Sequence, residues 1–127
     1  MSQDLTDKPY DEFVRALLAS PYAVKLNVEL MKPEEADLLH AAIGLSTEAG
    51  ELLDALKKAA CYGKKIDWDN VIEEVGDIQF YLQAALNVLS KRCPGRDPRS
   101  ENRAKLMKRY PTGTFRSSDA AARADKI

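Results

Sequence analysis

Apolar residues recur every three or four positions along most of this sequence, which is the pattern of amphipathic helices. Prolines and glycines interrupt the pattern, and no segment shows the two-residue alternation of a half-buried strand. The uninterrupted segments predict helices over residues 10–19, 33–60, 98–110, and from Asp67 or Asp69 to 92. The two long helices are joined by a short connection at 61–68, so they are expected to run antiparallel. We therefore expect an all-α fold, an antiparallel helix bundle of about four to five helices.

Each of the two long helices carries an acidic pair at one edge of its apolar stripe. On the first, Glu48 and Glu51 border the stripe, and Gly44 and Ala55 share their face and would let another helix or a ligand come close. On the second, Glu74 and Asp77 repeat the i, i+3 spacing. Packing the two stripes face to face is expected to bring the four carboxylates together.

An acidic pair at helical spacing is most often a solvated face, but two observations favour a cation site here. Four like charges at the edge of a core repel one another unless cations neutralise them. The lysines that accompany a solvated acidic face at i, i+4 are missing, because Leu52, Ala55, Ile78 and Tyr81 hold those positions. Oxygen ligands alone favour Mg²⁺ or Mn²⁺, and the single histidine, His40, does not have the spacing of a di-iron site.

Composition limits the class of protein. A chain of 127 residues with 31% charged residues is typical of one globular domain, here residues 1–127. No apolar run is long enough to span a bilayer, and a signal peptide is not expected, so we predict a cytoplasmic protein with no membrane partner. Cys61 and Cys93 lack metal or redox spacing and are interpreted as reduced thiols. The small size makes self-association a natural way to gain core.

Charge is distributed unevenly along the chain. Residues 1–90 contain 8 Lys/Arg and 16 Asp/Glu, whereas residues 91–127 contain 11 and 4. A basic C-terminal part suits a nucleic-acid arm, a solvated end or a segment that folds over the acidic part. No nucleic-acid reading motif is present, so no nucleic-acid partner is expected.

Four sequence blocks together resemble the MazG-like all-α nucleoside triphosphate pyrophosphohydrolases. These blocks are LLHAAIGLSTEAGELLDALKKAACYGKKID, EEVGDIQFYL, ENRAKLMKRYP and AARADK, and the resemblance covers roughly residues 38–127. It implies that Glu48, Glu51, Glu74 and Asp77 are catalytic metal ligands that hold two or three Mg²⁺ (or Mn²⁺) ions. It also implies hydrolysis of (deoxy)nucleoside triphosphates to monophosphate and pyrophosphate by a homodimer or homotetramer.

Several other residues are candidates for binding the substrate. By position in the resembling blocks, Tyr81 is expected to line the nucleotide pocket, and Asn102, Lys105 and Arg109 to reach the phosphates. Lys58 lies near the angle of Glu51 and is a further phosphate candidate. The N-terminal part, 1–33, is predicted to hold a helix and a base-pocket segment, in which Asn27 is the best hydrogen-bonding candidate. The roles of His40 and Trp68, as base contacts or packing residues, stay open.

The resemblance implies a reaction but leaves several alternatives for the nucleotide base of the substrate and for the biological role. Phage relatives of the MazZ type act on (d)GTP, so (d)GTP is the first expectation, with a host cytoplasm as the location if a phage encodes the chain. Alternatives are a dUTP or dCTP enzyme, a broad house-cleaning pyrophosphatase, or a non-catalytic nucleotide-binding module on the same fold.

Overall fold

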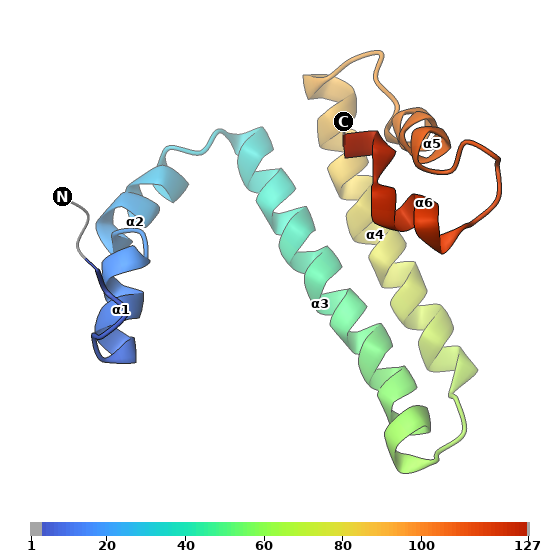
Figure 1. Ribbon diagram of the computed structural model, residues 1–127, viewed down its shortest axis with the longest axis horizontal. Coiled ribbons are helices and arrows are strands. Elements are labelled where there is room, and N and C mark those ends of the chain that lie inside the picture. The colour runs from blue at the N-terminus through green and yellow to red at the C-terminus, as the bar shows by residue number, and fades with distance from the viewer. Residues whose placement is uncertain (1–3, 127) are drawn as a thin grey trace. The chain divides into compact units, whose positions relative to one another are not determined.

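The computed structural model describes residues 4–126, and the described chain contains helices and no strands (Figure 1). The predicted all-α class is therefore confirmed at this level. The elements are α1 (Tyr10–Leu17), α2 (Pro21–Glu29), α3 (Pro33–Tyr62), α4 (Trp68–Arg92), α5 (Pro98–Arg109), α6 (Ser117–Ala122) and the short 3-10 helix η1 (Ala124–Lys126).

The described chain separates into two compact units, with the boundary between Ala85 and Leu86 inside α4. The N-terminal unit contains α1 to α3 and most of α4, and the C-terminal unit contains the end of α4 with α5, α6 and η1. Over residues 4–126 no helix combines the length and the apolar character that crossing a bilayer requires.

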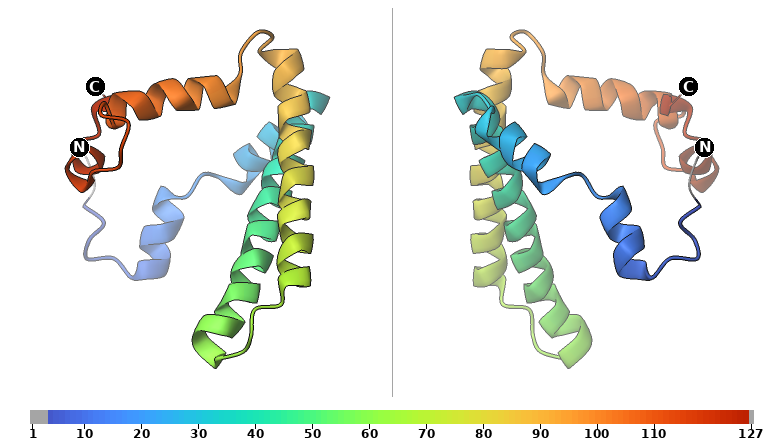
Figure 2. Two further views of the ribbon diagram at one scale, coloured as in Figure 1. Left: turned by 90° about the vertical axis from the view of Figure 1, so that its right-hand side faces the viewer. Right: turned by 90° about the vertical axis from the view of Figure 1, so that its left-hand side faces the viewer.

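The two long helices α3 and α4 lie side by side and run antiparallel, as the sequence predicts (Figures 1 and 2). Gly63 ends α3 in the left-handed region, at φ 64°, where a glycine avoids the steric cost of a Cβ. The next helix begins directly after Asp67, whose Oδ1 accepts a hydrogen bond from the backbone N–H of Asn70 at 3.2 Å. The sequence predicts that this helix starts at Asp67 or Asp69, and Asp67 is the residue that caps it.

The face between α3 and α4 differs in part from the expected one. Gly44 and Ala55 allow the close approach that the sequence predicts, but the apolar stripes do not provide the most buried positions. The buried positions of α3 are the small residues Ala41, Gly44 and Ala55, which lie on the acidic edge rather than on the leucine stripe. The leucine stripes are Leu38, Leu45, Leu52 and Leu56 of α3, and Ile78, Leu82, Leu86 and Leu89 of α4. A Cβ on Gly44 would overlap the ring of Tyr81, so the two helices approach closely at this point. The leucine stripes stay partly open, since Leu56 is 40% and Leu82 is 44% exposed. Small residues therefore make the most buried contacts of this face, and leucines such as Leu45, Leu52 and Leu86 are half-buried beside them.

The sequence interpretation missed three short elements. α2 occupies the segment that was predicted only as a base pocket, and Pro21 stands in its first turn, a position that suits proline. α6 and η1 follow the predicted fourth helix, in a part interpreted only as a tail. α6 has the sequence SSDAAA, which offers no apolar periodicity to detect.

Candidate metal centre

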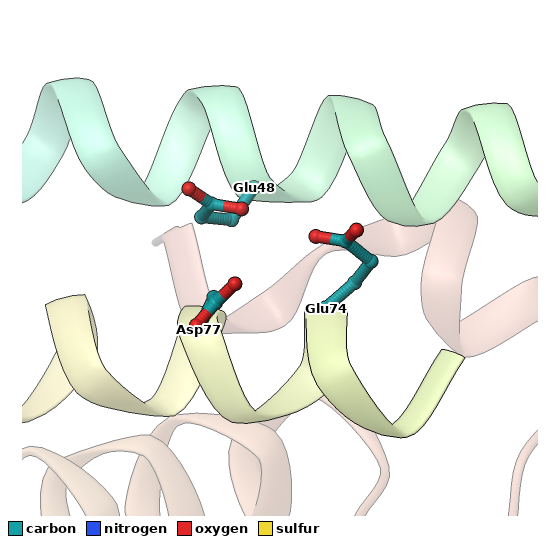
Figure 3. Close-up of side chains that lie close together, drawn as sticks. All are labelled: Glu48, Glu74 and Asp77. Atoms are coloured by element: carbon teal, nitrogen blue, oxygen red, sulfur yellow. The ribbon is translucent and has the colours of Figure 1, made fainter. Parts of the chain in front are cut away.

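Three of the four predicted ligands converge between α3 and α4. Carboxylate oxygens of Glu48, Glu74 and Asp77 all lie within 4.8 Å of one another. Glu48 projects from α3 toward the two acids of α4, which are one helical turn apart (Figure 3). Glu48 and Glu74 are half-buried and Asp77 is exposed, so the cluster has a solvent-facing side.

The electrostatics of the cluster disfavour charge on Glu74. The pKa of its carboxyl is raised, first because burial disfavours the ionised form and then because of a hydrogen bond with Glu48. The like charges of Glu48, Glu51 and Glu73 raise the pKa of Glu74 further. A cation at this place would relieve the same repulsion.

Glu51, the fourth predicted ligand, lies outside the group of three. It follows Glu48 by about one turn of α3 and is exposed. Its charge still acts on Glu74, so the two carboxylates lie in the same electrostatic environment. The structure thus brings three predicted ligands together and places the fourth beside them.

The donor set suits a hard divalent cation. Oxygens bound to one octahedral Mg²⁺ at about 2.1 Å are separated by at most about 4.2 Å. The three carboxylates are within 4.8 Å, so a small side-chain movement is enough to reach one ion or to bridge two. Asp77 and Glu51 are exposed, so this side of the cluster is open to solvent.

Tyr81 lies on the same face of the helix pair as the acids, one turn beyond Asp77. Its half-buried ring packs on Gly44, with its centroid 6.0 Å from that of the His40 ring, and it meets Phe80 edge-on at 5.2 Å. Tyr81 and His40 therefore pack on each other, and Tyr81 forms one wall beside the acidic cluster.

The other candidates of the N-terminal unit are exposed. Lys58 pairs with Asp54 one turn earlier on α3 at 3.2 Å. Asn27 lies on α2, and Trp68 is the first residue of α4. The structure shows no contact of these three with the acidic cluster, and their predicted roles stay predictions.

The remaining candidates belong to the C-terminal unit, on α5. Asn102 and Lys105 are exposed. Arg109 instead forms a two-pronged ion pair with Asp125 of η1, which sequence reasoning missed. The two residues are 16 positions apart, and no periodic pattern links such a pair. Glu73, which adds to the repulsion on Glu74, was also missed, although its place beside Glu74 in the chain was visible.

Comparisons with protein-family models, with curated proteins and with solved structures gave no significant match. The family resemblance therefore stands on the four sequence blocks alone.

Proposed function

We propose that this chain hydrolyses (deoxy)nucleoside triphosphates to monophosphate and pyrophosphate with the help of Mg²⁺ or Mn²⁺. The observation that carries the proposal is the convergence of the carboxylates of Glu48, Glu74 and Asp77. The resemblance of the surrounding sequence blocks to the MazG-like pyrophosphohydrolases supplies the reaction and the substrate class.

The proposed ligands of two or three ions are Glu48, Glu51, Glu74 and Asp77. Divalent cations bound there would offset the charge of the triphosphate and lower the pKa of a bound water. The chain's own contribution is to hold the acids on two packed helices, so that a tetra-anionic substrate approaches an acidic face only when cations are present. Tyr81 would border the nucleotide, and Lys58, Asn102, Lys105 and Asn27 are the proposed polar contacts.

We also propose that the chain acts as a homodimer or homotetramer. Among the described residues, the buried hydrophobic side chains are Ala41 and Ala55, which is a small core for two helices of this length. The leucine stripes of α3 and α4 remain partly exposed, and a second copy with the same stripe would be complementary to them.

A panel of the eight common (d)NTPs, each with Mg²⁺ or Mn²⁺, tests the proposal. We expect pyrophosphate release from at least one nucleotide, with (d)GTP as the first expectation, and a nucleoside monophosphate as the second product. Nucleoside diphosphate and orthophosphate as products would contradict the assignment of the bond. Metal-dependent binding of a nucleotide without turnover would favour the non-catalytic module instead.

A further inference from the structure

The ion pair between Arg109 and Asp125 is the best-formed polar contact of the C-terminal unit. Arg109 Nε donates to Asp125 Oδ1 at 2.7 Å, and Nη2 donates to Oδ2 at 2.8 Å. The Asp125 side chain is 0% exposed and that of Arg109 is 19% exposed. This two-pronged geometry satisfies both carboxylate oxygens of a group that has lost its water.

Two other arginines of the same unit also form two-pronged ion pairs, but with acids that are close in the chain. Arg96 pairs with Glu101, and Arg116 pairs with Asp119, in both cases within five positions along the chain. Both arginines are more than half exposed. The Arg96–Glu101 pair is exposed on both sides, and such local, solvated pairs contribute little to stability. The Arg109–Asp125 pair, by contrast, connects α5 to η1 across 16 positions.

The backbone before Asp125 is shaped for this contact. Arg123 ends α6 with φ 49° and ψ 49°, a left-handed conformation that a residue with a Cβ adopts at a steric cost. Directly after this reversal, η1 begins and its Asp125 reaches α5. The pair with Arg109 is the contact by which the segment after this reversal is held to α5.

On α5, Asn102, Lys105 and Arg109 share one face, within an arc of about 60°. Asn102 and Lys105 are exposed, whereas η1 lies against the end of the helix that carries Arg109. The three residues were predicted together as phosphate contacts, but their surroundings differ, because only Arg109 is held by η1. Two donors of the Arg109 guanidinium are already used by Asp125.

We propose that Arg109 is a positioning residue, which fastens η1 to α5 through Asp125, and that it is not itself a phosphate ligand. The expected effect of Arg109 on nucleotide turnover rests on the proposed function, whereas its structural role does not. When the Arg109–Asp125 ion pair is formed, the last turn of α5 stays ordered and Lys105 keeps a fixed position. Without it, η1 detaches and the end of α5 frays beside Lys105.

The test compares Arg109→Gln and Asp125→Asn in the full chain. The matched control is Arg96→Gln, which removes the same type of charge from an exposed local pair outside the segment that is measured. The first measurement is the rate of cleavage by thermolysin in the segment between α5 and α6, residues 110–116. We expect both Arg109→Gln and Asp125→Asn to raise this rate at least about tenfold, and the control to leave it nearly unchanged. This measurement needs no nucleotide, so it stands even if the proposed hydrolysis fails.

The second measurement separates positioning from phosphate binding. A positioning role predicts that Arg109→Gln and Asp125→Asn raise KM for the triphosphate by a similar factor, about threefold to tenfold, with kcat largely kept. A role as phosphate ligand predicts that the two variants change KM in opposite directions. Arg109→Gln would raise KM, whereas Asp125→Asn would lower it, because it releases Arg109 and removes a negative charge. An unchanged cleavage rate in Asp125→Asn, or a lower KM in that variant, would overturn the proposal.

Arg109→Lys provides a milder variant if the other two unfold, with folding checked by circular dichroism. Lysine keeps the charge but cannot form the two-pronged pair. We expect it to raise the cleavage rate by an intermediate factor. Wild-type resistance to thermolysin in Arg109→Lys would contradict the fastening role.

Discussion

Gly44 and Tyr81 meet at a close approach of α3 and α4, where the tyrosine ring fills the space that a side chain on Gly44 would need. The contact lies on the face that also carries Glu48 and Glu74. It therefore sets how near the acids of one helix come to those of the other. The geometry of the candidate metal centre depends on this pair as much as on the acids themselves.

Gly44→Ala is expected to destabilise the protein by about 1–3 kcal/mol, since the added methyl group must displace the Tyr81 ring. The gain in helix propensity, up to about 1 kcal/mol, does not compensate. Gly50→Ala on the same helix is the matched control, because nothing lies within 4 Å of its added Cβ. Urea unfolding should show a lower free energy of unfolding for Gly44→Ala and a higher one for Gly50→Ala than for the wild type. Equal effects would show that the Gly44–Tyr81 contact does not hold the helices.

Removal of divalent cations should abolish turnover and lower thermal stability. If Mg²⁺ or Mn²⁺ binds the carboxylates only in the folded state, a concentration of 100 times the dissociation constant adds about 2.7 kcal/mol. For a chain of this size we expect a melting temperature higher by about 5–10 °C, measured by calorimetry with and without EDTA. A control in which NaCl of equal ionic strength replaces the divalent salt excludes a general effect of charge screening on the melting temperature. Full turnover in excess EDTA would contradict the metal centre.

Without metal, Glu74→Gln should be more stable than the wild type. The pKa of Glu74 is raised, so near neutral pH the folded chain keeps a carboxylate whose charge its surroundings disfavour. The neutral amide removes that repulsion. A lower melting temperature of Glu74→Gln in EDTA would indicate that Glu74 supports the fold rather than a cation.

Acid should break the ion pair between Arg109 and Asp125 only at very low pH. Pairing with Arg109 lowers the pKa of Asp125 from 3.8 to about 2. Because the folded-state pKa is the lower one, the stabilisation is fully present above about pH 4 and is lost as the pH falls through about 2. The Nε–H signal of Arg109 in NMR spectra should report this midpoint. A midpoint near 3.8 in a chain that is still folded would show that the pair contributes nothing.

Self-association should depend on the leucine stripe. Leu82→Glu places a charge on the partly exposed stripe of α4 and should shift sedimentation toward the monomer. Gln83→Glu adds the same charge about 100° away on the helix and is the control. A wild-type chain that sediments as a monomer at about 100 µM would rule out the proposed assembly.

The sequence predicted the long helices well, because their periodicity extends over many turns and their ends carry clear signals such as Gly63 and Asp67. It predicted from helical spacing that four carboxylates would meet, and three of them, Glu48, Glu74 and Asp77, do. It predicted that Gly44 and Ala55 would allow a close approach, but not that these two positions and Ala41 would be more buried than the leucines, because a helical wheel ranks leucine above smaller residues as core. Asp125 was missed for another reason, since its partner is distant in the chain and pairing of that kind has no period.

The central claim, that Glu74 belongs to a catalytic metal centre, is tested most directly by one comparison of rates. Pyrophosphate release with saturating Mg²⁺ is measured for the wild type, Glu74→Gln and Glu73→Gln on the nucleotide that the panel selects. Glu73 is adjacent, exposed and equally charged, but lies outside the convergent group. We expect Glu74→Gln to lose at least about 100-fold in kcat and Glu73→Gln to lose little. Equal rates for Glu74→Gln and the wild type would contradict the account.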